Sequence, residues 1–193
     1  ETCMCIDLNQ TAFQLANKIK RVLDSDVRIR ISLNNATFFE YDSDEDVVII
    51  APVSLLEIEE KEKAQIASRA AYELVLMSAK TSARKFNGIL LPDCFLYCVY
   101  STLHEIGHHD FFVSSSATEF QGHVAQRESL LEFSKDKLIN AIASGQDPRN
   151  SQEIFARSYR NIPFEKIADD YARRLMPVVL SKLLVEDGPN EAK

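Results

Sequence analysis

The spacing of apolar residues predicts that the chain opens with a helix and continues with short strands. Residues 9–24 place apolar side chains three and four positions apart, as one face of an amphipathic helix requires. From residue 27 to 33 apolar and polar side chains alternate, which is typical of a half-buried strand. The predicted strands span residues 27–33, 37–42 and 47–51, with turns at Asn34-Asn35 and 43–46. We expect these three strands to form a small antiparallel sheet.

Helical patterns dominate the rest of the chain. Ser54 and Ser116 are each followed three residues later by a glutamate, the capping box that begins many helices. Asp93 is a third candidate cap, and Pro163 suits a first helical turn. Three predicted helices span residues 55–83, 93–110 and 117–143, and a short helix capped by Asn150 with Glu153 follows. The last predicted helix spans residues 163–175, and Met176-Pro177 then interrupts or kinks it. The pattern predicts an α+β fold: an N-terminal helix and a small three-stranded antiparallel sheet, followed by a mainly helical region.

Length and composition favour a single domain over residues 1–193. A chain of 193 residues with 46% hydrophobic content can close a real core, and no repeat or long linker divides it. The net charge of −7 disfavours direct nucleic-acid binding, because phosphate contacts draw on clustered Lys and Arg. The longest apolar run, 89–103, is interrupted by Pro92 and Asp93, so no membrane span is predicted. The first residues show no basic-then-apolar leader pattern, and we expect a cytoplasmic location.

The four cysteines have spacings that favour reduced thiols. Cys3 and Cys5 are separated by one residue, and Cys94 and Cys98 lie one turn apart in a predicted helix. Neither spacing is the Cys-x2-Cys of structural zinc sites, and thiols one turn apart on a helix rarely form a disulfide. A metal site built from both pairs is the less favoured alternative.

Three of the four histidines lie within six residues, in the run His104-Glu105-Ile106-Gly107-His108-His109. This is an HExxH motif, and the turns before it are apolar, as in a buried helix. On a helix, His104 and His108 stand one turn apart on the same face, so both imidazoles can bind one tetrahedral Zn²⁺. Glu105 projects beside them, toward a metal-activated water. The alternative is a surface helix that carries these residues by chance, although buried imidazoles without a metal would need other polar partners.

A catalytic zinc needs a third protein ligand, and three continuations of the motif compete for that role. The metzincin pattern is excluded, because Phe111 and Ser114 stand three and six residues beyond His108, where its glycine and third histidine would be. Glu128 lies twenty residues after His108, which is the interval in thermolysin-like gluzincins. The segment around it, however, has the pattern of an ordinary amphipathic helix with charged residues on its exposed face. Glu165 is favoured, since Asp169 one turn later can orient a ligating histidine through its second ring nitrogen.

The segment around Glu165 also resembles a known family. It reads Glu165-Lys166-Ile167-Ala168-Asp169-Asp170-Tyr171-Ala172-Arg173-Arg174-Leu175-Met176-Pro177. Downstream of a His-Glu-Ile-Gly-His helix, this pattern is similar to the ImmA/IrrE family of gluzincin-type zinc metallopeptidases, and segment 37–51 resembles their small sheet. The resemblance implies zinc bound by His104, His108 and Glu165, with Asp169 behind them. The interval between the two halves of the site is longer than such families usually have, so residues from about 114 to 161 are interpreted as a helical insertion that could cover or reshape the cleft.

These residues predict a zinc-dependent peptidase in which Glu105 is the general base toward a metal-activated water and then passes the proton to the leaving amine. The donor that stabilises the oxyanion stays open among four candidates, His109, His123, Tyr159 and Tyr171. The resemblance implies a protein or peptide substrate, with a transcriptional regulator as one candidate, bound as an extended strand at a sheet edge. The alternative function is a zinc-stabilised, non-catalytic binding module that sequesters a protein partner.

Overall fold

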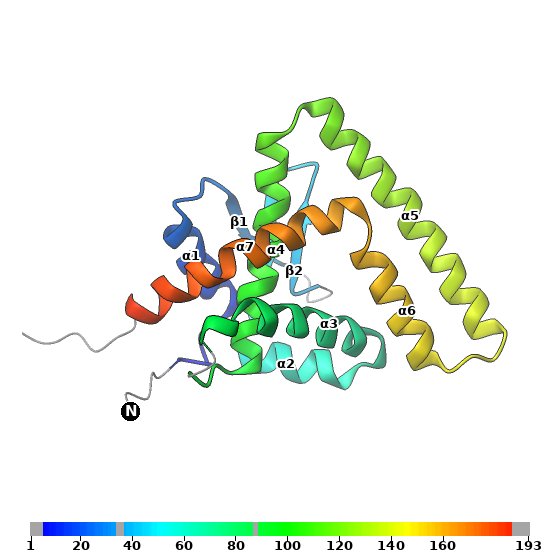
Figure 1. Cartoon of the computed structure of the whole chain (residues 1–193), viewed down its shortest axis with the longest axis horizontal. Coiled ribbons are helices and arrows are strands. Elements are labelled where there is room, and N and C mark those ends of the chain that lie inside the picture. Colours follow the sequence, from blue (N-terminus) through cyan, green and yellow to red (C-terminus); the bar gives the residue numbers. More distant parts are fainter. Residues whose placement is uncertain (1–5, 34–36, 87–88, 187–193) are drawn as a thin grey trace, which may run out of the picture.

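The computed structural model describes residues 6–33, 37–86 and 89–186, and within them the predicted α+β fold is confirmed (Figure 1). The elements follow in the order α1 (Ala12–Leu23), β1 (Arg28–Ile31), β2 (Phe39–Asp42), β3 (Val47–Ile50), α2 (Leu55–Ala64), α3 (Ile66–Ser82), the short 3-10 helix η1 (Arg84–Phe86), α4 (Asp93–Ser114), α5 (Ala117–Ala143), α6 (Pro148–Arg160) and α7 (Pro163–Glu186). None of the described helices is both long and apolar enough to cross a bilayer.

The prediction of an antiparallel sheet is wrong in part, because the sheet is mixed. Its strand order is β1-β3-β2, with β1 parallel to β3 and β2 antiparallel to it. The most apolar strand, β3, takes the centre, and β2 forms an edge of the sheet. Alternation along a strand shows which side chains share a face, but it does not show which strands are neighbours or in which direction they run. The turn predicted at Asn34-Asn35 lies outside the described residues.

The helix predicted over residues 55–83 is divided in two. Gln65 has an extended backbone, with φ −100° and ψ 126°, and it separates α2 from α3. The Ser68 hydroxyl donates to the carbonyl of Glu62 across the break, so part of the lost helical bonding is replaced. Helical propensity on both sides hides such a break, since neither Gly nor Pro marks it.

The last helix continues beyond its predicted end. Pro177 lies inside α7, which runs to Glu186, whereas the sequence suggested an interruption at Met176-Pro177. Met176 and Leu180 are fully buried on either side of the proline, and their packing outweighs the loss of one backbone hydrogen bond. Two caps also differ from the prediction: α4 follows Pro92 with Asp93 already in its first turn, and Asp147 rather than Asn150 caps α6. The predicted helix at 117–143 is confirmed as α5.

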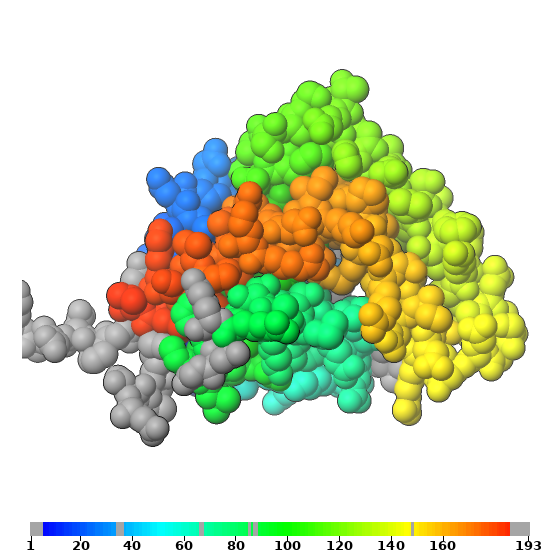
Figure 2. Space-filling view, viewed as in Figure 1, coloured from blue at the N-terminus to red at the C-terminus, as the bar shows by residue number. Residues whose placement is uncertain are grey.

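Helix α4 runs through the core, with almost every side chain from Cys94 to His109 buried. Helix α7 crosses it, and α1, α3 and the sheet pack around the pair (Figure 1). The antiparallel helices α5 and α6 form an outer wing on one side of the molecule (Figure 2). A second, smaller apolar cluster, made by Phe111, Phe120, Ile162 and Phe164, joins the base of this wing to α4 and α7.

The close approach of α4 and α7 depends on Gly107. A Cβ built on this glycine would lie 2.9 Å from the Cα of Ala168 and 3.0 Å from the Cβ of Tyr171. We expect Gly107→Ala to lower the free energy of unfolding by about 1–3 kcal/mol, because backbone atoms of α7 must move apart from α4. Urea denaturation followed by circular dichroism measures this change.

Gly122 provides the matched control for this prediction. It lies in the exposed part of α5, where an added Cβ meets nothing within 4 Å. Gly122→Ala should raise the free energy of unfolding by about 0.5–1 kcal/mol, through helix propensity alone. A Gly107→Ala protein as stable as the Gly122→Ala protein would contradict the proposed packing constraint.

Candidate metal centre

The three residues proposed as metal ligands meet at one cleft of the molecule. His104 and His108 come from one face of α4, and Glu165 comes from the first turn of α7. All three side chains are buried at the wall of a cleft of about 730 Å³. Their ligand atoms lie within 4.8 Å of one another, so one cation can contact all three.

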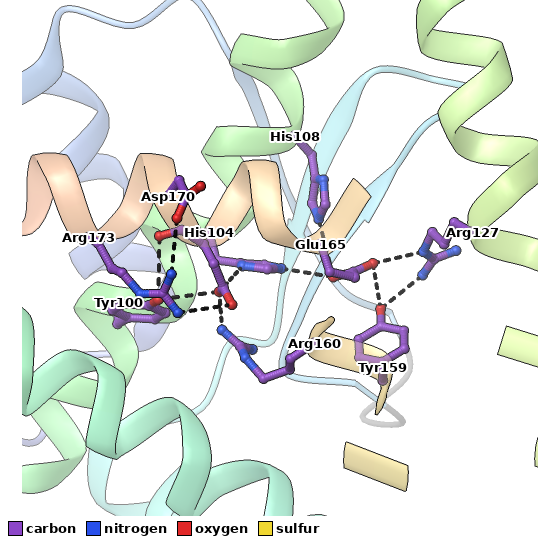
Figure 3. A network of polar contacts seen from close by, with 10 residues as sticks. Tyr100, His104, His108, Arg127, Tyr159, Arg160, Glu165, Asp170 and Arg173 are labelled. Atoms are coloured by element: carbon purple, nitrogen blue, oxygen red, sulfur yellow. Dashed lines mark hydrogen bonds and ion pairs between the residues drawn. The ribbon is translucent and has the colours of Figure 1, made fainter. Parts of the chain in front are cut away.

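The atoms that converge are those a metal requires. His104 Nε2 lies 3.1 Å from Glu165 Oε2, and His108 Nε2 lies 3.6 Å from the same oxygen (Figure 3). Burial alone would raise the pKa of the Glu165 carboxyl, but hydrogen bonds from His104 and His108 hold that pKa well below its usual range. The carboxylate is therefore ionised, as a metal ligand must be.

Asp169 lies behind His104, as predicted for an orienting carboxylate. Its Oδ1 is 2.9 Å from His104 Nδ1, which leaves Nε2 directed toward Glu165. Burial opposes protonation of this imidazole, yet the two carboxylates outweigh it and raise the pKa of His104 to about 9. Tyr100 and Arg160 also donate to Asp169 Oδ1, so the orienting carboxylate is itself fixed in place.

His108 is oriented by aromatic packing instead of by a carboxylate. Its ring stacks on Phe164, with centroids 4.3 Å apart and an interplanar angle of 15°, and on Tyr41 at 5.6 Å and 26°. Its Nδ1 is buried, and no partner for it lies among the described residues. The two histidines thus present Nε2 to the same point for different physical reasons.

Glu105, the predicted general base, lines the cleft beside the two histidines. Its side chain is half-buried, whereas the ligands are fully buried. Burial raises the pKa of the Glu105 carboxyl, and the neighbouring imidazoles oppose that rise. A carboxylate with a raised pKa is a better proton acceptor than an exposed one, which suits general-base chemistry.

The second oxygen of Glu165 is held from the α5–α6 wing. Arg127 Nε and the Tyr159 hydroxyl each donate to Glu165 Oε1 at 2.9 Å, and Arg127 Nη2 donates to the Tyr159 oxygen at 3.2 Å (Figure 3). The Arg127 guanidinium also lies over the rings of Tyr159 and Phe164. Sequence reasoning missed Arg127, because it lies in an amphipathic segment and no motif spacing marks it.

The other residues considered from sequence lie elsewhere, apart from Tyr159. Glu128, the competing ligand, is exposed on α5 and is not part of the cleft wall. Tyr159 lines the cleft, but His109, His123 and Tyr171 do not. His109 instead joins α4 to the sheet region through Asp46 and Asp26, at 2.8 and 3.1 Å.

Two of the four cysteines of the alternative metal site lie among the described residues. Cys94 and Cys98 are buried free thiols on α4, as predicted. Cys3 and Cys5 lie outside the described residues. The donor set that the described residues bring together, two imidazole nitrogens and one carboxylate oxygen, fits a divalent transition metal with an open coordination position.

Comparisons of the chain with protein-family models, with curated proteins and with solved structures each found no match. The function is therefore inferred from the residues of the site itself.

Metal content distinguishes the two candidate third ligands. We expect the wild-type chain to bind one divalent cation, and Glu165→Ala to lose stoichiometric binding because two histidines alone do not hold it. Glu128→Ala is the matched control and should retain the metal. Elemental analysis after dialysis checks this, with circular dichroism to show that both variants fold. Loss of metal from the Glu128 variant alone would refute the ligand assignment.

The hydrogen bond from Arg127 to Glu165 should strengthen metal binding, so its removal should weaken the site. We expect Arg127→Met to lower metal affinity by about 10–100-fold, because Glu165 Oε1 loses the charged one of the two donors that fix its carboxylate. Competition with a coloured chelator measures the affinity. Arg149→Met, at an exposed position on α6, is the control. Unchanged affinity in Arg127→Met would mean that this arginine only packs the wing against the core.

Proposed function

We propose that the protein is a zinc-dependent peptidase. The observation that supports this most directly is the convergence of His104, His108 and Glu165 beside Glu105, in a cleft bordered by a sheet edge. Two histidines and a glutamate are a donor set typical of catalytic zinc, with one position left for the reacting groups. When bound, zinc would supply Lewis acidity, which polarises a peptide carbonyl and lowers the pKa of a water molecule.

Glu105 would carry the proton during hydrolysis. Its carboxylate accepts a proton from the attacking water as the oxygen forms a bond to the carbonyl carbon. The same carboxyl then donates that proton to the departing nitrogen as the carbon–nitrogen bond breaks. Its half-buried position in the cleft wall supports this role, because the group can reach the substrate while its pKa stays raised.

An extended peptide fits the edge of the sheet. The whole of β2 and its flanking residues, 37–43, line the cleft, and the strand pairs only with β3 among the described strands. A substrate could therefore add to this edge through main-chain hydrogen bonds and pass across the candidate metal centre. Hydrolysis of a peptide is favoured over that of a small molecule by this strand edge.

Tyr159 and Arg127 are the donors proposed for the oxyanion. Both line the cleft next to Glu165, and their present hydrogen bonds run to Glu165 Oε1 and to each other. During the reaction, a guanidinium hydrogen of Arg127 that these bonds do not use, or the Tyr159 hydroxyl after it turns away from Glu165, would donate to the oxyanion. Of the four candidate oxyanion donors named from the sequence, Tyr159 alone is kept in this proposal.

The local resemblance to the ImmA/IrrE family supports a protein substrate, and a transcriptional regulator is one candidate. A cytoplasmic location is supported by the free thiols of Cys94 and Cys98, since reduced cysteines are usual in that compartment.

Glu105→Gln tests the proposal. We expect the variant to keep its zinc and to lose peptide hydrolysis by about 10²–10⁴-fold, because the amide cannot accept the proton. Cleavage of a peptide library, read by mass spectrometry, measures activity, and elemental analysis measures zinc. Glu128→Gln, at an exposed position, is the control.

Two results would contradict the peptidase proposal. Cleavage that persists in Glu105→Gln would show that this carboxylate is not the base. A zinc-loaded wild type that cleaves nothing, yet binds a protein partner equally well with Glu105→Gln, would favour a binding module.

A further inference from the structure

The cleft continues from the metal centre along α4 toward α2 and α3. Tyr97, Ser101, His104 and His108 form one stripe on α4, and all four line the cleft. Tyr97 lies seven residues before His104, so this end of the cleft is displaced by about 10 Å along the helix axis. That distance corresponds to about three residues of extended peptide.

The carboxylate of Glu62 lines the cleft beside Tyr97, at this end. It is half-buried, and the Tyr97 hydroxyl donates to its Oε1 at 3.4 Å. Its lysine neighbours on α2 pair with other residues, Lys61 with Glu57 and Lys63 with Glu59. Among the described residues, no Lys, Arg or His forms an ion pair with Glu62.

The positive charges of the cleft are already neutralised. Arg127 is paired with Glu165, and Arg160 is paired with Asp169. The edge strand adds two further carboxylates to the cleft wall, Glu40 and Asp42. The charge that stays uncompensated at the Glu62 end is therefore negative, and burial raises the pKa of Glu62 because no cation offsets it.

The walls around Glu62 suit the stem of a long cationic side chain. Ala71 and Val75 on α3 supply small and aliphatic surface, and Tyr97 packs edge-on against Phe39 with centroids 6.1 Å apart. Methylene groups of Lys or Arg pack well on such surface while their charged ends reach a carboxylate. Aromatic rings nearby favour a cation further.

We propose that Glu62 is a specificity residue that binds a positively charged group of the peptide substrate, within about three residues of the scissile bond. The inference rests on the proposed peptidase function and adds the charge class of the substrate. The cation is an alkylammonium or guanidinium group, and a basic side chain and a free N-terminus share this chemistry.

The test uses the zinc-loaded full chain and synthetic fluorogenic peptides. A mixed library first identifies a cleaved peptide, and the three residues on each side of its scissile bond are then replaced in turn by lysine or norleucine. Norleucine has a similar length and no charge. A parallel pair with a free or acetylated N-terminus separates a terminal amine from a side chain. We expect a positive charge at one of these peptide positions to raise kcat/KM by about 10–100-fold over the uncharged peptide, the range for a charge-assisted hydrogen bond.

Variants of Glu62 identify the residue responsible. Glu62→Gln should remove the preference for the cation, so that the ratio of kcat/KM between the lysine and norleucine peptides falls to about one. Glu62→Lys should reverse the preference, toward a glutamate at the same peptide position. Glu60→Gln, exposed on the same helix, is the matched control and should change neither rate.

The results that would overturn the role of Glu62 differ from those that would overturn the peptidase proposal. Equal kcat/KM for lysine and norleucine peptides, or a preference that survives Glu62→Gln, overturns the role of Glu62 while Glu105-dependent cleavage continues. If nothing is cleaved, a peptide that binds the wild type is selected from the library instead, and its lysine and norleucine variants are compared by fluorescence anisotropy. Weaker binding of the lysine peptide to Glu62→Gln supports the subsite, and equal binding overturns it.

Discussion

The contact between α4 and α7 is the constraint on which the candidate site depends. Gly107 faces the backbone of Ala168, and the absence of a Cβ allows the two helices to approach more closely than ordinary side chains permit. Glu165 and Asp169 lie on either side of that alanine, so the distance between the helices decides whether their carboxylates reach His104. Gly107, inside the HExxH motif, therefore allows α4 and α7 to pack closely, and this packing sets the distances between the proposed ligands.

Burial of two carboxylates is costly unless positive charge compensates it. Arg173 on α7 supplies part of that charge, 3.7 Å from Asp169, and two arginines of the α5–α6 segment supply more. Arg127, on α5, pairs with Glu165, and Arg160, the last residue of α6, pairs with Asp169. Both arginines belong to the segment interpreted from sequence as an insertion that could cover or reshape the cleft. The α5–α6 wing contributes to the cleft wall. It also offsets the charge of Glu165 through Arg127 (Figure 3) and that of Asp169 through Arg160.

Sequence reasoning located the elements and the three converging residues because both follow from local spacing. The pairs His104 with His108 and Glu165 with Asp169 are each one helical turn apart, and helical periodicity places each pair on one face. The order of the strands, the break at Gln65 and the role of Arg127 depend on contacts between distant segments. Such contacts leave no periodic pattern in the chain, so a sequence read locally does not contain them.

Because the proposed ligands are divided between α4 and α7, the metal site can form only at a late step of folding. The HExxH helix is synthesised before Glu165, and the two are joined only when α7 docks on α4. Before that contact forms, His104 and His108 lack Glu165, and a cation held there would have only two of the three proposed ligands. A nascent chain in which α7 has not yet docked therefore carries the motif without the activity proposed for it, so hydrolysis would begin only after this contact forms.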